Sequence, residues 1–290
     1  MGAADVVPGV SGGTMAFILG IYTQLIDAIK SFDGNWFKAI LQFNIKQVLS
    51  RPHFGFLIPL GIGIFSALLF FTRVVSIPEL LRSHPEQVYG LFFGLIAGSI
   101  LLLLRHMQGI KKIYWFFFLA GAAAGFIIFN LVPMTTPNAA WFIFLSGALA
   151  ICAMILPGIS GSFILLILNK YAYIFDAIGY FRFSVLIPFA LGAATGLILF
   201  SRVLSWLLHH YYRQTIMIIG GILAASLWVI WPFQHRTYEM VGRSEKLVSS
   251  TPVIPADWNE TVLVAIIMII TGFVIVTALD KLANRKQQIM

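Results

Sequence analysis

Long apolar segments constrain the fold of this 290-residue chain more than any other feature. A hydrocarbon core about 30 Å thick needs about 20 consecutive apolar residues in each helix that crosses it. Several segments of the sequence meet or approach this requirement, so the chain is predicted to be an all-α, multi-pass (polytopic) integral membrane protein. The expected spans are residues 57–75, 88–104, 113–132, 139–156, 185–208, 215–233 and 262–279.

The composition excludes several other classes of protein. Only 10% of the residues are charged, against about 25% in a soluble domain, which must cover its surface with solvated groups. The sequence is therefore a poor match to a soluble globule or a disordered chain. It is also a poor match to a nucleic-acid binder, although its net charge is +8. The expected partner is the bilayer, with no nucleic acid, and the residues do not fix an oligomeric state.

A duplicated motif divides the chain into two similar halves. Residues 8–13 (PGVSGG) recur 149 positions later as residues 157–162 (PGISGS), and a second block repeats around Pro59 and Pro188. Self-similarity over such a length indicates two copies of one structural unit. We predict a first membrane repeat at residues 1–138 and a second at residues 139–290, which together form one transport domain.

The number of spans and the charge of the loops predict how the two repeats are oriented. Each repeat has three clear spans after its Pro-Gly element, and this odd number predicts two inverted-topology repeats. Segments assigned to one side of the membrane sum to +10, and those assigned to the other side sum to 0. Lys and Arg are enriched in cytoplasmic loops, so the positive side is expected to be cytoplasmic. The positive segments are residues 30–51, 105–112, 202–213 and 280–290, and the opposite ones are residues 73–86, 170–182 and 236–260.

The Pro-Gly element is predicted to break a helix within each repeat. Pro157 has no N–H and Gly158 tolerates unusual backbone angles, so a helix that enters before Pro157 ends there and a second helix follows. The result is either a re-entrant helix hairpin or two full spans joined by a tight turn, and the re-entrant form is favoured. Each repeat is thus expected to contain a broken hairpin followed by three transmembrane helices. Residues 1–10 lack the basic region and cleavage site of a signal peptide, so none is expected there.

Both copies of the motif are suited to bind an anion. The first N–H groups of a helix lack intrahelical partners and lie at the positive end of the helix dipole. Inverted-repeat transporters place such helix ends at the membrane midplane, facing the substrate. The alternative is that Ser caps the helix and Gly permits close packing. The candidate phosphate-binding residues are Ser11, Gly12, Gly13 and Thr14 in the first copy and Ser160, Gly161 and Ser162 in the second.

A few charged residues also recur in matched positions. Arg73 and Arg202 lie near the ends of matched spans, where an Arg is suited to bidentate contact with phosphate or to anchoring at the interface. Asp27 and Asp176 are a second matched pair and are candidates either for proton coupling or for interfacial caps. Asp5 has no acidic counterpart and is a further candidate for coupling.

The sequence does not indicate an enzyme. Its six histidines form none of the usual metal-binding or catalytic patterns, and no nucleophile-elbow motif is present. His209 and His210 follow a span and are typical of interfacial anchors, and the single Cys152 lies inside an apolar run. No catalytic residue, metal site or cofactor is therefore expected.

The two motif copies resemble those of a known family. Residues 4–22 (ADVVPGVSGGTMAFILGIY) and residues 156–162 (LPGISGS) are similar to the PopT-type polyprenyl-phosphate transporters, and the resemblance extends over essentially the whole chain. It implies a flippase that returns undecaprenyl phosphate from the outer to the inner leaflet of the cytoplasmic membrane, which recycles the lipid carrier for cell-wall and other cell-envelope synthesis. The alternative function is a secondary transporter or channel for a small anion.

Overall fold

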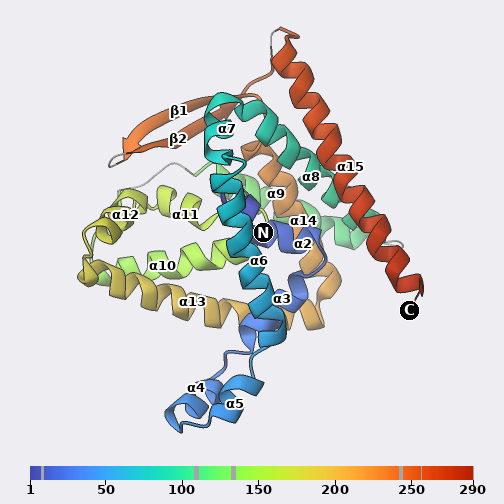
Figure 1. The fold of residues 1–290 in the computed structure, drawn as a ribbon. Helices are drawn as coiled ribbons and strands as arrows, with labels where there is room; N and C mark the ends of the chain where they lie inside the picture. The colour runs from blue at the N-terminus through green and yellow to red at the C-terminus, as the bar shows by residue number, and fades with distance from the viewer. Residues whose placement is uncertain (8–9, 108–110, 132–134, 242–243, 256, 290) are drawn as a thin grey trace.

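The computed structural model describes residues 1–7, 10–107, 111–131, 135–241, 244–255 and 257–289 (Figure 1). Pro8 and Gly9, which begin the first motif, fall outside these residues. Six helices of the described chain are long and apolar enough to cross a bilayer, which makes this a multi-pass membrane protein. They are α6 (Phe54–Arg73), α8 (Pro85–His106), α9 (Lys112–Phe129), α13 (Phe183–His210), α14 (Tyr212–Val229) and α15 (Glu260–Ile289).

The remaining expected span, residues 139–156, corresponds to the shorter helix α10 (Ala140–Ile155). This apolar helix has 16 residues, fewer than a perpendicular crossing of the bilayer needs. It ends where the sequence predicts a break. Leu156 has extended backbone angles, as expected for the residue before a proline.

Short helices follow each copy of the motif, and their lengths match. Helices α2 (Gly12–Ile18) and α11 (Gly161–Ile167) have seven residues each, and helices α3 (Tyr22–Lys30) and α12 (Tyr171–Gly179) have nine. In both cases the second helix begins 149 residues after the first. Helices α11 and α12 are bent by 110° relative to each other. The other short helices are α1 (Gly2–Asp5), α4 (Gly34–Leu41), α5 (Ile45–Ser50) and α7 (Ile77–Ser83).

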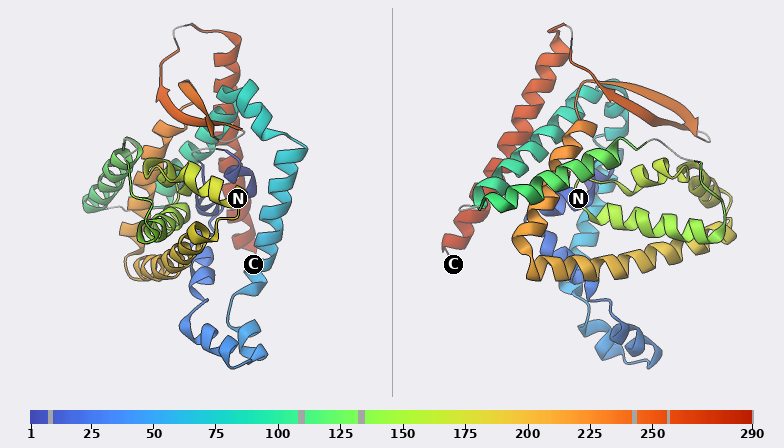
Figure 2. Two further views of the ribbon diagram at one scale, coloured as in Figure 1. Left: turned by 90° about the vertical axis from the view of Figure 1, so that its left-hand side faces the viewer. Right: turned by 180° about the vertical axis from the view of Figure 1, so that it is seen from behind.

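Three pairs of apolar helices pack side by side: α8 with α15, α9 with α14, and α10 with α13 (Figures 1 and 2). Glycines allow the two backbones of each pair to approach closely, as is common between membrane helices. A Cβ added at Gly94 would lie 2.0 Å from the carbonyl oxygen of Ile269, and one at Gly192 would lie 1.8 Å from that of Phe144. The largest buried cluster lies where α1, α2 and α3 meet α8, α13 and α14, so the first motif is held inside the protein.

Helix α6 has very different surroundings. It stands at one side of the molecule (Figure 2, left), and none of its residues is buried. Its Gly63 occupies the position of Gly192 in the repeated block, yet nothing lies within 4 Å of a Cβ added there. Matched sequences in α6 and α13 therefore have different neighbours.

One element departs from an all-helical chain. Strands β1 (Gln234–Val241) and β2 (Ser244–Pro252) pair antiparallel, with Gln234 opposite Pro252. The sequence predicts only a polar connection between spans at residues 236–260. Residues 237–241 (TYEMV) include β-branched and aromatic residues, which favour strands, but a signal this short is easily overlooked between two long helices.

The contrast between Gly192 and Gly63 leads to a test of stability. We expect Gly192→Ala to lower the free energy of unfolding by about 1–3 kcal/mol, because its Cβ would force the backbones of α10 and α13 apart. Gly63→Ala is the matched control and should be neutral or slightly stabilising, because Ala favours a helix over Gly. Thermal unfolding of the two purified variants in detergent would measure this. Equal losses of stability would show that the packing of α10 on α13 is not the cause.

Candidate functional site

The first motif is closed by its own side chains. Ser11 caps helix α2, because its Oγ accepts a hydrogen bond from the Thr14 N–H at 3.3 Å. The hydroxyls of Ser11 and Thr14 also contact each other at 3.2 Å, and both residues are buried. Ser11 therefore has the capping role that the sequence left open as the alternative to anion binding.

A carboxylate lies at the positive end of helix α2. The Gly12 N–H donates a hydrogen bond of 2.7 Å to Oδ1 of Asp5. A Cβ added at Gly12 would lie 3.0 and 3.1 Å from the two carboxylate oxygens, so a larger residue would crowd this contact. The helix end that the sequence predicts to bind an anion thus contacts an anionic side chain of the protein itself.

The second motif meets the first at its Pro-Gly break. Gly158 has a φ of +93°, a conformation that favours glycine, and its N–H donates a hydrogen bond of 2.9 Å to Oγ1 of Thr14. The hydroxyl of Tyr22 donates to the carbonyl oxygen of Ile155 at 3.2 Å. A Cβ at Gly13 would lie 2.7 Å from that same oxygen. Thr14 of the first motif and Tyr22 at the start of α3 therefore satisfy backbone groups on both sides of Pro157.

The start of helix α11 is more open than the start of α2. Ser160 precedes α11 without capping it by a side-chain hydrogen bond. Its hydroxyl instead contacts that of Ser162 at 2.7 Å. Ser162 is exposed, and Ser160 and Gly161 are partly exposed, whereas residues 11–14 are all buried. The two copies of the motif thus present different environments: one is closed by Asp5, and the other is accessible.

The matched arginines lie in different surroundings. Arg73 is exposed in the last turn of α6. Arg202, on α13, lines a cavity of about 590 Å³ together with Asp27 of α3. Asp176 is exposed on α12. The structure therefore brings Asp27 and Arg202 to one site, whereas Arg73 and Asp176 do not line this cavity.

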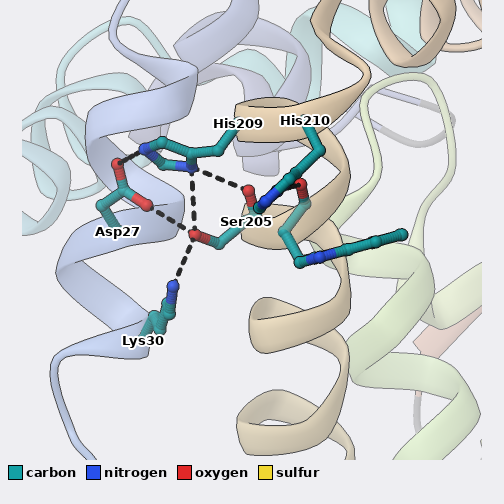
Figure 3. A network of polar contacts seen from close by, with 6 residues as sticks. Asp27, Lys30, Ser205, His209 and His210 are labelled. Atoms are coloured by element: carbon teal, nitrogen blue, oxygen red, sulfur yellow. Dashed lines mark hydrogen bonds and ion pairs between the residues drawn. The ribbon is translucent and has the colours of Figure 1, made fainter.

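Three further residues join Asp27 in a polar network that the sequence did not reveal (Figure 3). Ser205 donates to Oδ1 of Asp27 at 2.8 Å and accepts from Nζ of Lys30 at 3.1 Å. Nε2 of His209 lies 3.6 Å from Oδ2 of Asp27. His209 thus contacts a carboxylate in addition to lying near a span end. The sequence did carry one indication of this network: Ser205 and His209 are four residues apart, so they lie on the same face of helix α13.

A buried lysine near the bend between α11 and α12 was also missed. Lys170 is 1% exposed, and its Nζ donates to the carbonyl oxygen of Thr136 at 2.8 Å and to Oδ1 of Asn138 at 2.9 Å. These contacts fix the chain before α10 against the bend after α11. Within the described ranges, His, Cys, Asp and Glu side chains form no group of three that is suited to hold a metal ion.

Comparison with known proteins adds independent information. A family model described as undecaprenyl phosphate translocase-like matches residues 1–248. A polyprenyl-phosphate transporter of Vibrio cholerae is 35% identical, over 98% of this chain and 94% of that protein. A polyprenyl-phosphate transporter of Staphylococcus aureus is 28% identical, over 80% of this chain and 83% of that protein. No solved structure matches the chain significantly.

The contact between Thr14 and Gly158 can be tested by removing one hydroxyl. Thr14→Val keeps the shape of the side chain but leaves the Gly158 N–H without its acceptor, which should cost about 1–3 kcal/mol of stability. Thr14→Ser is the control, since it keeps the hydroxyl and loses one methyl group, worth about 1 kcal/mol. Thermal unfolding in detergent should rank the proteins as wild type, then Ser, then Val. A Val variant as stable as the Ser variant would contradict this role for the hydroxyl.

Proposed function

Because the chain belongs to the undecaprenyl phosphate translocase-like family, we propose that it carries a polyprenyl phosphate across the cytoplasmic membrane. The proposed direction is from the outer to the inner leaflet, which returns undecaprenyl phosphate for reuse as a lipid carrier in cell-envelope synthesis. Two relatives named polyprenyl-phosphate transporters support this substrate. The observation that carries the proposal is the hydrogen bond between Thr14 and Gly158, because it joins the two motifs that are suited to bind an anion.

The proposed architecture is two inverted repeats, residues 1–138 and 139–290, that form one transport domain. Its support is the equal length of α2 and α11 and of α3 and α12, each separated by 149 residues. Helix α10 ends at Ile155 after 16 residues and α11 begins at Gly161, which supports a re-entrant hairpin broken at Pro157 in the second repeat. The excess of Lys and Arg on one side favours the inversion. In this arrangement the motifs face each other near the middle of the membrane.

The proposed phosphate site uses both motifs in turn. Ser160 and Ser162 have accessible hydroxyls, and together with Gly161 they are the groups that would first receive a phosphate. At the first motif, the phosphate would replace the carboxylate of Asp5 as acceptor for the Gly12 N–H, beside Ser11, Gly13 and Thr14. Asp5, released in this exchange, is then a coupling group, as are Asp27 and Asp176.

A protein path for the head group has a clear energetic reason. A charge at the centre of a bilayer costs several kcal/mol or more, whereas the isoprenoid tail is as apolar as the lipid around it. The protein therefore needs to solvate only the phosphate. Arg73 and Arg202, on opposite sides of the proposed inverted structure, would attract the head group on each side.

Removing the matched arginines tests this mechanism. In proteoliposomes, the double variant Arg73→Ala, Arg202→Ala should translocate labelled polyprenyl phosphate at least about tenfold more slowly, because charge-assisted contacts to phosphate are lost. Arg105→Ala is a matched control, since Arg105 is also exposed near the end of a long helix, and it should transport normally. Unchanged translocation by the double variant would remove these arginines from the mechanism.

A binding measurement distinguishes the lipid from a small anion. Undecaprenyl phosphate at about 100 times its Kd should stabilise the purified protein by about 2.7 kcal/mol. Undecaprenol, which has the same tail without the phosphate, should stabilise it much less. The readout is the thermal midpoint in detergent with each compound and with inorganic phosphate. Protection by inorganic phosphate without protection by the lipid phosphate would instead favour transport of a small anion.

A further inference from the structure

The cavity lined by Arg202 and Asp27 contains basic side chains that are suited to bind an anion, and it is separate from the two motifs. It has a volume of about 590 Å³ and lies between the end of α3, the start of α4 and helix α13. None of its lining residues belongs to either motif. They are Asp27, Lys30, Ser31, Asp33, Gly34, Asn35, Arg202 and His209.

Both acidic residues of this cavity already have partners. Asp33 pairs with Arg51 at 3.2 Å and accepts a hydrogen bond from the Trp36 N–H at 2.8 Å. Asp27 accepts from Ser205 and lies 3.6 Å from Nε2 of His209. Both carboxylates are thus in contact with other groups of the protein.

The tautomer of His209 follows from its other contact. Nδ1 lies 2.8 Å from the carbonyl oxygen of Ser205, and a carbonyl can only accept, so Nδ1 carries a hydrogen. Nε2 is then the nitrogen that faces Asp27 (Figure 3). The Asp27 carboxylate is therefore contacted by Ser205 and His209, and Lys30 donates to Ser205 rather than to Asp27.

Two cations remain available to a ligand. Nζ of Lys30 donates to the hydroxyl of Ser205, which is neutral, and an ammonium group has two further donors. Arg202 is exposed and presents a guanidinium group with five donors. Within the described part of the chain, neither side chain has a carboxylate within 4 Å. A lysine and an arginine with unused donors at one cavity are suited to a doubly charged oxyanion.

We propose that this cavity binds a phosphate monoester, with Lys30 and Arg202 as its principal ligands. Loop charge assigns this end of α3 and α13 to the cytoplasmic side. The site is then where the head group of a polyprenyl phosphate leaves the protein, or where free phosphate enters from the cytoplasm. The assignment of the ligand as the head group of a polyprenyl phosphate rests on the proposed function. The binding of a phosphate by Lys30 and Arg202 does not depend on that function.

A cysteine in the cavity wall can report its occupancy. Asn35 is exposed and lines the cavity, and Cys152 is the only native cysteine. Asn35→Cys would be made in a full-length Cys152→Ser background and reconstituted in nanodiscs. The measurement is the rate at which a charged thiol reagent labels it, with undecaprenyl phosphate, with inorganic phosphate, or with neither. Gln42→Cys, exposed beyond the end of α4, is the control reporter.

We expect undecaprenyl phosphate to slow labelling of Asn35→Cys about fivefold or more and to leave Gln42→Cys unchanged. Adding Lys30→Gln should remove the protection, because a charge-assisted contact is lost. Lys38→Gln, which removes a charge from the exposed face of α4 outside the cavity, should retain it. Protection by the lipid phosphate alone identifies a head-group site, and protection by inorganic phosphate identifies a site that recognises phosphate without the tail.

Failure of this proposal can be separated from failure of the proposed function. Absence of protection by either compound, or protection that persists with Lys30→Gln, would overturn the cavity as a phosphate site. Translocation by the wild-type protein, measured in parallel in proteoliposomes, would still stand in that case. Conversely, protection of Asn35→Cys in a protein that translocates no polyprenyl phosphate would retain the site and reject the transport function.

Discussion

Backbone groups inside a membrane protein need hydrogen-bond partners, and the break between α10 and α11 makes this requirement acute. An unsatisfied N–H in hydrocarbon costs several kcal/mol, so a broken helix is stable only where protein supplies partners. Thr14 accepts from Gly158 on one side of the break, and Tyr22 donates to Ile155 on the other. Both partners come from residues more than 130 positions away in the sequence. The irregular backbone of one half thus depends on side chains of the other half.

This dependence also explains why the two motifs differ. Thr14 must be buried to reach Gly158, and burial of residues 11–14 leaves their helix end facing the interior, where the carboxylate of Asp5 accepts the Gly12 N–H. The second motif has Met154 at the position of Asp5, and Ser160 and Ser162 remain accessible. A duplicated sequence therefore produces one helix start that is closed by Asp5 and one that is accessible.

Local sequence patterns predicted most of the elements and few of the contacts. The spans follow from apolar length, and the break at Pro157 follows from the chemistry of proline and glycine. The bond between Lys30 and Ser205 joins residues 175 positions apart, and no periodicity reports such a contact. Arg73 and Arg202 match in sequence, but α13 packs on α10 while no residue of α6 is buried. The repeated sequence therefore does not predict that the two arginines have different surroundings. The hairpin β1–β2 was missed because short strands carry a weak signal.

Helix α3 connects the motif region to the cavity at Arg202. Tyr22, at its start, contacts Ile155 beside the break, and Lys30, at its end, lies in the cavity. With a rise of 1.5 Å per residue, these positions are about 12 Å apart along the helix. Half of a hydrocarbon core is about 15 Å thick. In the function proposed above, with the motifs near the midplane, a phosphate that leaves them would reach Lys30 close to the membrane interface along this single helix of nine residues. Because Tyr22 and Lys30 lie on one short helix, a movement of α3 relative to α13 would change the contact of Tyr22 with Ile155 and that of Lys30 with Ser205 together.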